Sequence, residues 1–178
     1  MYQEILKFWF EEIEPALWWK KDDNFDELLI ERFSEIHKRA SRCELYKWRS
    51  EPEGRLAEII ILDQFSRNMF RGSARAFAYD AMALTLSQEA IACGADQALP
   101  PGQRIFLYMP FMHSESLQIH EVAVDLFSSS GEPGNLEFEL KHKKIIEKFG
   151  RYPHRNTVLG RQSTSDEIEF LTQPGSSF

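Results

Sequence analysis

Apolar residues recur at helical spacing along most of this 178-residue sequence, and no segment of useful length alternates apolar with polar residues. The first such set is Ile5, Leu6, Trp9, Phe10 and Ile13. This spacing predicts a helix over residues 2–13, whereas a strand with one solvent-facing side would need alternation. The sequence as a whole therefore predicts an all-α fold.

Turn and capping residues divide the rest of the chain into further helices. Asp22, Asp23 or Asn24 can cap a second helix that buries the apolar residues from Phe25 to Ile36. Further helices are predicted at residues 56–71, 74–93, 103–112, 115–128 and 138–149, and after the capping box Thr164–Glu167. Residues 151–163 look irregular. We expect a single domain over residues 1–178, with about eight to nine mostly antiparallel helices in a bundle or a short solenoid.

Charge and composition limit the partners and the compartment. The net charge of −7 argues against a nucleic-acid partner, because phosphate binding needs a basic face. Glutamates interrupt the apolar N-terminus, unlike a signal peptide, and no run of 18 apolar residues could span a membrane. The two cysteines have no motif spacing. We expect a soluble, cytoplasmic protein, and the oligomeric state is left open.

The predicted helix at residues 56–71 changes character along its length. Its first turns are apolar almost all round, and its last turns carry the polar residues Asp63, Gln64, Arg67, Asn68 and Arg71. At about 100° per residue these five fall on one arc of roughly 140°. We expect this end of the helix to face a polar space.

Several sequence blocks resemble a known family. They are Leu62-Asp63-Gln64-Phe65-Ser66-Arg67-Asn68-Met69-Phe70-Arg71-Gly72, Tyr108-Met109-Pro110-Phe111-Met112-His113-Ser114-Glu115, Phe149-Gly150-Arg151-Tyr152-Pro153-His154-Arg155-Asn156 and Pro174-Gly175-Ser176-Ser177-Phe178. Together they resemble the bacterial domain-of-unknown-function 924 (DUF924) family over nearly the whole chain. The resemblance implies an all-helical fold similar to tetratricopeptide-repeat superhelices, and it implies no function. Ser66, Cys43 and His120 depart from the family pattern, which has Pro, Gly and Gln there.

Arginine is the only cation between Lys47 and Lys141. Arginine suits bidentate, partly buried contacts to carboxylate or phosphate groups, whereas lysine suits solvated faces. One interpretation is a basic groove that holds an anionic ligand. The other is a structural network in which Asp63, Asp80 and Glu115 neutralise the arginines Arg67, Arg71, Arg75 and Arg155, with Asp63 and Arg67 as an i,i+4 pair.

Three residues are candidates for acid–base chemistry. They are His113 and Glu115, which precede a predicted helix, and His142, which shares an inward face with Ile145. No HxxxH, HExxH or HxH spacing supports a metal, so none is expected. The sequence has no P-loop and no GxSxG nucleophile motif, and we expect no cofactor.

The sequence therefore predicts a polar pocket that binds a small anionic molecule or a peptide carboxylate. The same pocket could carry out acid–base catalysis. Its predicted ligand-binding residues are Asp63, Gln64, Arg67, Asn68, Arg71, Arg75, Arg151, Arg155 and Asn156. Two alternatives stay open: a peptide- or protein-binding module, and a salt-bridge network without a ligand. At the C-terminus, we expect the Phe178 ring to pack against the fold and its carboxylate to meet Arg71 or Arg155.

Overall fold

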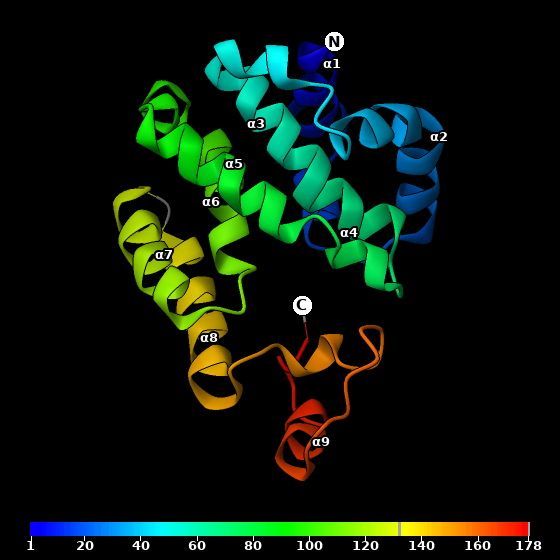
Figure 1. The fold of residues 1–178 in the computed structure, drawn as a ribbon, viewed down its shortest axis with the longest axis vertical. Helices are drawn as coiled ribbons and strands as arrows, with labels where there is room; N and C mark the ends of the chain where they lie inside the picture. The colour runs from blue at the N-terminus through cyan, green and yellow to red at the C-terminus, as the bar shows by residue number, and fades with distance from the viewer. Residues whose placement is uncertain (132, 178) are drawn as a thin grey trace.

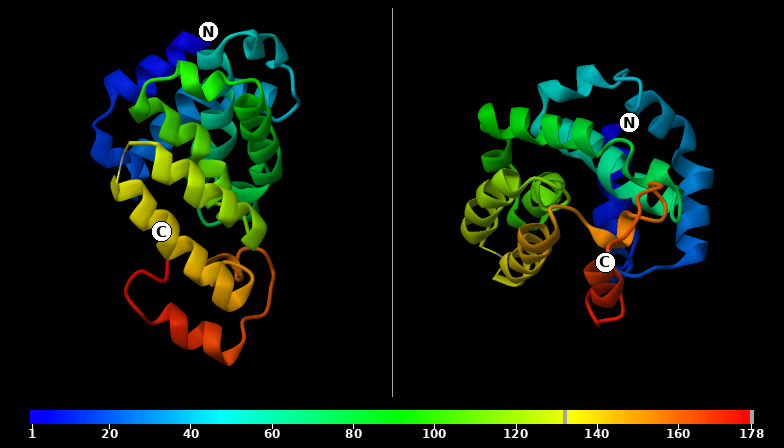
Figure 2. Two further views of the ribbon diagram at one scale, coloured as in Figure 1. Left: turned by 90° about the vertical axis from the view of Figure 1, so that its left-hand side faces the viewer. Right: turned by 60° about the horizontal axis from the view of Figure 1, so that its bottom comes forward.

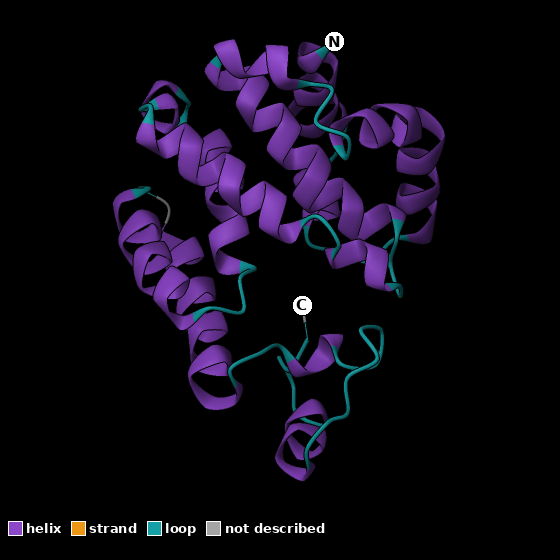
Figure 3. Cartoon of the chain, viewed as in Figure 1, coloured by secondary structure: helices purple, strands orange, loops and turns teal. Residues whose placement is uncertain are grey.

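The computed structural model describes residues 1–131 and 133–177, with only the backbone of Pro133, and this part contains helices and loops but no strand (Figure 3). Its α-helices are α1 (Tyr2–Lys7), α2 (Asp23–Ala40), α3 (Pro52–Ile60), α4 (Ser66–Met69), α5 (Asp80–Ala92), α6 (Pro101–Met112), α7 (Leu117–Ser129), α8 (Pro133–Phe149) and α9 (Ser165–Leu171). The predicted all-α fold with about eight to nine helices is confirmed. No helix in the described part is both long and apolar enough to cross a membrane.

The helices pack both against neighbours in sequence and against helices further along the chain, and Figures 1 and 2 show their arrangement. Helix α3 contacts α1, α5 and α6, α2 contacts α4, and α6, α7 and α8 pack in series. Helix α9 lies beyond the end of α8, at the far end of the molecule from α1 (Figure 1). The irregular segment between α8 and α9 contains the 3-10 turn Pro153–Arg155. This arrangement brings the α8–α9 segment close to the ends of several earlier helices.

Aromatic side chains fill the centre of the main core. The fully buried ring of Trp9 lies 5.5 Å from Phe65 and 5.7 Å from Phe106, measured between ring centroids. Aromatic pairs at such distances stabilise a core beyond their burial alone. A second, smaller cluster joins Ile145, Ile146 and Tyr152 near α9. The α8–α9 segment thus contributes a buried aromatic residue of its own.

The helix predicted at residues 56–71 runs through α3, a π-helical segment at Ile61–Phe65, and α4. The apolar residues of its first half are fully buried, including Leu56 and Ile59. A π-helical turn holds more residues than an α-helical turn and often marks a functional position in a helix. Here it spans Asp63 and Gln64, the first two residues of the predicted polar arc.

Three predicted helix boundaries were wrong. Residues 74–77 form a 3-10 turn capped by Ser73, and α5 begins only at Asp80. Helix α7 begins at Leu117, because the Ser114 hydroxyl accepts a hydrogen bond from the Ser116 backbone N–H, before the helix. Helix α6 begins at Pro101, since proline is favoured in the first turn of a helix. The predicted capping box at Thr164 and Glu167 is confirmed.

Cys43 and Ser66, two of the three departures from the family pattern, have local consequences close to α2 and α4. Cys43 has a φ of 58°, a left-handed conformation that glycine adopts at lower cost. The Ser66 hydroxyl donates a hydrogen bond to the Leu62 carbonyl and lies 2.8 Å from the buried His37 Nε2. A proline could not make this contact, so Ser66 adds a polar contact between α2 and α4.

Candidate functional site

A buried carboxylate and an imidazole form the centre of the candidate site. Asp63 comes from the π-helical segment, and His113 follows the last residue of α6. His113 Nδ1 lies 2.8 Å from Asp63 Oδ1, and the side chain of Asp63 is fully buried. The contact is therefore made by two side chains that different helices hold in place.

Two further contacts hold the Asp63 carboxylate in position. Gln64 Nε2 donates to Asp63 Oδ2 at 2.5 Å, and Arg67 Nη1 lies 3.0 Å from Asp63 Oδ1. Burial alone would raise the pKa of Asp63, but the charge of Arg67 and the hydrogen bonds from His113 and Gln64 lower this pKa to about 2. Asp63 is therefore a carboxylate at neutral pH, and His113 Nδ1 donates the hydrogen bond to it.

His113 is neutral and presents its second nitrogen. Burial, followed by the positive charge of Arg67, lowers the pKa of His113, although Asp63 opposes the shift. Because the proton is on Nδ1, Nε2 carries a lone pair, and no described residue forms a hydrogen bond with Nε2. The side chain is 12% exposed, which leaves it an opening to solvent. Its geometry is that of a general base oriented by a carboxylate.

Two arginines share the carboxylate of Asp80 next to this pair. Arg67 donates to both oxygens of Asp80 at 3.0 Å, and Arg155 Nη1 donates to Oδ2 at 3.3 Å. Arg155 Nη2 also donates to the His113 carbonyl at 3.0 Å. The structure thus brings Asp63, Arg67, His113 and Arg155 together with Asp80, which the sequence predicted only as a counter-ion in the structural network.

Arg155 keeps one donor without an acceptor. Its side chain is 5% exposed, and its guanidinium lies over the rings of Phe77 and Tyr152 at 4.6 and 4.4 Å from their centroids. Burial, followed by repulsion from Arg67, lowers the pKa of Arg155 to about 10. The buried Nε–H has no hydrogen-bond partner in the described structure. Such an unsatisfied donor is costly and calls for an explanation.

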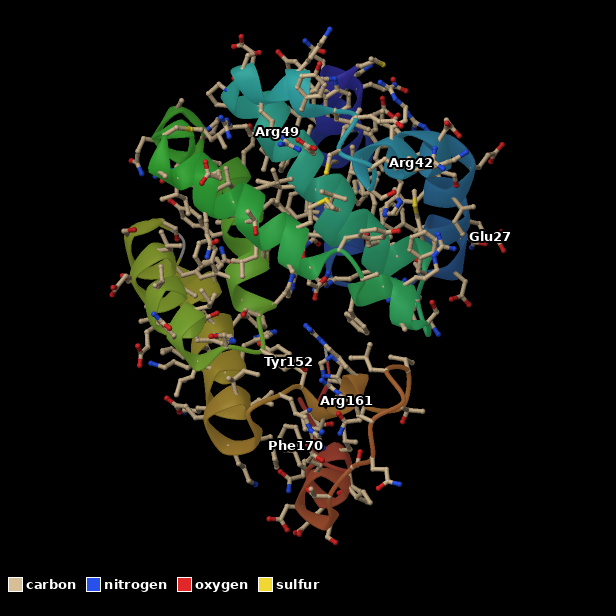
Figure 4. The ribbon with its side chains drawn as sticks, viewed as in Figure 1. Glu27, Arg42, Arg49, Tyr152, Arg161 and Phe170 are labelled. Carbon is tan, nitrogen blue, oxygen red and sulfur yellow. The ribbon has the colours of Figure 1, made fainter. Side chains whose placement is uncertain are left out.

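The structure does not pair His113 with Glu115. Both carboxylate oxygens of Glu115 bind Arg161, at 2.6 and 3.0 Å, and one also accepts the backbone N–H of Tyr152 at 2.8 Å. Asn156 joins this group through its Oδ1, which accepts from Arg161 Nε at 2.9 Å. Glu115 therefore fastens the α8–α9 segment to the turn between α6 and α7, while Asn156 holds Arg161 within the segment; Figure 4 labels Tyr152 and Arg161 in this segment.

His142 contacts its own helix and Tyr152. Its Nδ1 is 2.7 Å from the Phe138 carbonyl of its own helix, and its ring packs 5.9 Å from that of Tyr152. Burial is the main cause that lowers the pKa of His142 to about 3. This neutral side chain packs beside Tyr152.

Sequence reasoning missed a buried pair on α7 and α8. His120 Nδ1 lies 2.7 Å from Glu139 Oε1, and both side chains are fully buried. His120 Nε2 faces the Ser114 carbonyl at 2.9 Å, so Nε2 carries a proton and one further proton is shared between Nδ1 and Glu139. Burial raises the pKa of Glu139, which favours the neutral pair. No spacing motif in the sequence signals this pair, because its members lie 19 residues apart.

The remaining predicted ligand-binding residues lie elsewhere. Asn68 and Arg71 bind Asp26 of α2, at 2.9 Å for the amide and at 2.5 and 2.9 Å for the guanidinium. The prediction that the five polar residues of the arc face one space was wrong, because its two ends face different neighbouring elements.

Two other arginines of the predicted set are also separate from the pair. Arg75 is exposed and lies over the Phe70 ring at 3.8 Å. Arg151 binds both oxygens of Glu167 at 2.7 and 2.8 Å. Phe178, which we expected to dock through its ring and carboxylate, is outside the described residues. Among those residues, no three His, Cys, Asp or Glu side chains are grouped so as to hold a metal ion.

Comparison with known proteins gives a family and a fold. The family model for a bacterial protein of unknown function (DUF924) matches residues 5–175. The solved structure of a protein of unknown function, ATU0120 from Agrobacterium tumefaciens, is 39% identical and superimposes with a TM-score of 0.90, covering 96% of each chain. No curated protein matches the sequence.

Proposed function

The chain belongs to the DUF924 family of bacterial proteins of unknown function, and we propose that it is an enzyme in which His113, oriented by Asp63, acts as a general base on a small anionic molecule. The observation that carries this proposal is the 2.8 Å contact between His113 Nδ1 and the buried Asp63 carboxylate. It leaves Nε2 as the unprotonated nitrogen. That nitrogen has no hydrogen-bond partner in the described structure.

The proposed chemistry is a single proton transfer. His113 Nε2 takes a proton from the substrate or from a water molecule and becomes an imidazolium. Asp63 stays ionised, because its pKa is about 2, and it stabilises that imidazolium through Nδ1–H. A positioned base of this kind contributes about 10²- to 10⁴-fold to a reaction rate.

The anionic character of the ligand is argued from Arg155. Its buried Nε–H lacks an acceptor, and its neighbour Arg67 adds a second positive charge. An oxygen of an anionic ligand would supply that acceptor after a small displacement of the side chains around it. Arg155 would then hold the ligand. Its contact with the His113 carbonyl fixes the position of its guanidinium relative to His113.

A structural network without a ligand is the second candidate, and one observation favours it. The two arginines next to the pair, Arg67 and Arg155, are matched by the two carboxylates Asp63 and Asp80. An anionic ligand is therefore not required to balance their charge. In that case, the Asp63–His113 contact would serve only to join the π-helical segment to the end of α6.

A thermal-shift screen with small anionic metabolites separates the two candidates. The proposed function predicts that at least one anion raises the melting temperature, and that Arg155→Gln removes the shift in a folded protein. The wild type should convert that molecule, while His113→Gln should bind it and lose at least about 100-fold in rate. Glu89→Gln, an exposed change on α5, is the control and should behave as the wild type. A bound anion that is converted equally fast by His113→Gln would overturn the assignment of the base.

A further inference from the structure

A hollow of about 360 Å³ lies between α2 and the end of α4, and His113 is not among the residues that line it. Its walls include Glu27 and Ile30 from α2, and Asn68, Met69 and Arg71 from α4 and the turn after it. The volume falls in the range of small-molecule sites, about 300–1,000 Å³. Asn68 and Arg71 come shortly after Arg67 in the sequence. Arg67 contacts Asp63, whereas Asn68 and Arg71 line the hollow.

One end of this α2–α4 hollow presents a fixed cation. Asp26 accepts from Arg71 Nε and Nη2 at 2.5 and 2.9 Å, and from Asn68 Nδ2 at 2.9 Å. These bonds hold the guanidinium plane in one orientation, and Nη1 of Arg71 is left without a hydrogen-bond partner among the described residues. A guanidinium that is already held in place loses little entropy when it binds a carboxylate.

The other groups in the hollow are the ion pair of Lys21 and Asp23, with Nζ and Oδ1 3.9 Å apart, a further anion and an apolar surface. Glu27 is exposed and makes no ion pair within the described part of the chain; Figure 4 labels it on α2. Ile30, one turn further along α2, is 44% exposed, and Met69 supplies a second apolar wall. Apart from the Lys21–Asp23 pair, the hollow therefore offers the available Nη1 of Arg71, the unpaired carboxylate of Glu27 and an apolar surface.

From this combination we propose that the α2–α4 hollow binds a small zwitterion, namely an amino acid with an apolar side chain. The ligand carboxylate would bind Arg71, its ammonium group would bind Glu27, and its side chain would pack on Ile30 and Met69. Both charged ends of such a ligand find a partner of opposite sign. This site does not depend on the proposed reaction at His113.

Isothermal titration of the full chain with three related probes tests the proposal. They are leucine, 4-methylpentanoate, which lacks the amine, and 3-methylbutylamine, which lacks the carboxylate. We expect leucine to bind at least about tenfold more tightly than either single-charge probe, because each charged hydrogen bond contributes roughly a factor of ten or more. Equal binding of 4-methylpentanoate and leucine would overturn the zwitterion assignment, and absence of leucine binding would overturn the site.

Matched variants locate the binding. Glu27→Gln removes a carboxylate that has no partner, so folding should be unchanged, while leucine should bind about tenfold more weakly. Glu31→Gln, also exposed on α2 but outside the hollow, should bind leucine as the wild type does. Arg71→Lys keeps the charge and loses the fork geometry, and it should also bind more weakly. Leucine binding that survives Glu27→Gln unchanged, or is lost in His113→Gln, would contradict the proposal.

Discussion

His113 Nδ1 and Asp63 Oδ1 meet at 2.8 Å although the two residues lie 50 positions apart in the chain. The contact joins the end of α6 to the π-helical segment, and Arg67 on the following turn binds the same carboxylate oxygen at 3.0 Å. One buried carboxylate thus orients the imidazole and neutralises a guanidinium. Both roles depend on its negative charge.

We predict that Asp63→Asn lowers the free energy of unfolding by about 3 kcal/mol, because the neutral amide leaves Arg67 with Asp80 alone. Urea denaturation at neutral pH measures the change. Asp125→Asn, at an exposed position of α7 without an ion pair in the described structure, is the matched control and should stay within about 0.5 kcal/mol of the wild type. Equal losses in the two variants would contradict the prediction.

Arg155→Ala should loosen the segment between α8 and α9. The side chain ties this segment to Asp80 and to the His113 carbonyl, so its removal leaves fewer contacts with the helices. Hydrogen exchange of the amides in residues 151–163 should become at least about tenfold faster, while amides of α3 keep their protection. Arg75→Ala, at an exposed side chain, is the control. A uniform increase in the exchange rate over the whole chain would show global destabilisation instead.

Stability should fall as the pH falls from about 7 to about 5. Burial is the largest cause that lowers the pKa values of His37, His142 and His154, to about 4, 3 and 4. The unfolded chain therefore takes up these protons near pH 6.5 while the folded protein does not, and each histidine costs up to about 1.4 kcal/mol per pH unit below that value. Urea denaturation at several pH values measures the slope. A stability that is constant from pH 7 to pH 5 would be inconsistent with neutral buried histidines.

Gly54→Ala should be strongly destabilising. A Cβ at this position in α3 would lie 2.1 Å from the Trp48 carbonyl oxygen, so the backbone of one of the two segments must move. We expect a loss of at least about 3 kcal/mol. Gly102→Ala, in the first turn of α6, meets no atom within 4 Å and should leave stability unchanged or raise it by up to about 1 kcal/mol. Thermal or urea unfolding of both variants tests the contrast.

Two buried glutamates should respond differently to the same substitution. Glu139→Gln should cost less than about 1 kcal/mol, because the new amide N–H can donate to His120 Nδ1 when that pair is neutral. Glu58→Gln should cost about 3 kcal/mol, because this fully buried carboxylate binds Arg49 at 2.7 and 2.8 Å. Urea denaturation at pH 7 compares them. A larger loss in Glu139→Gln would indicate that Glu139 and His120 form an ion pair.

The helices were predictable from local signals, whereas the site was predictable only in part. Apolar spacing and the capping box at Thr164 are read from neighbouring residues, and the structure agrees with both. Asp63, Arg67, His113 and Arg155 were selected by residue type, and they do lie together. The i,i+4 pair of Asp63 with Arg67 was predictable, but the contacts of His113 and Arg155 were not, because they depend on how separate helices pack.

Errors at the polar arc have a physical cause. A constant 100° per residue puts Asp63 and Arg71 on the same side of a helix, but the arc is wide enough for its ends to meet different elements. Arg71 therefore binds Asp26, a residue of α2 that no local pattern connects with it. The prediction of a helix beginning at residue 74 was also wrong, because the Ser73 hydroxyl caps a 3-10 turn there.

The π-helical segment Ile61–Phe65 also affects how sequences of this family should be compared. A π turn contains one residue more than the α turn it replaces, so a relative that lacks this residue could keep a continuous helix and a similar composition. Its aspartate and arginine would then be rotated relative to the end of α6, although the letters of the motif still match. An alignment that places a gap anywhere else in the helix would hide the difference. The position of a single-residue gap is thus informative about whether a relative can form the Asp63–His113 contact.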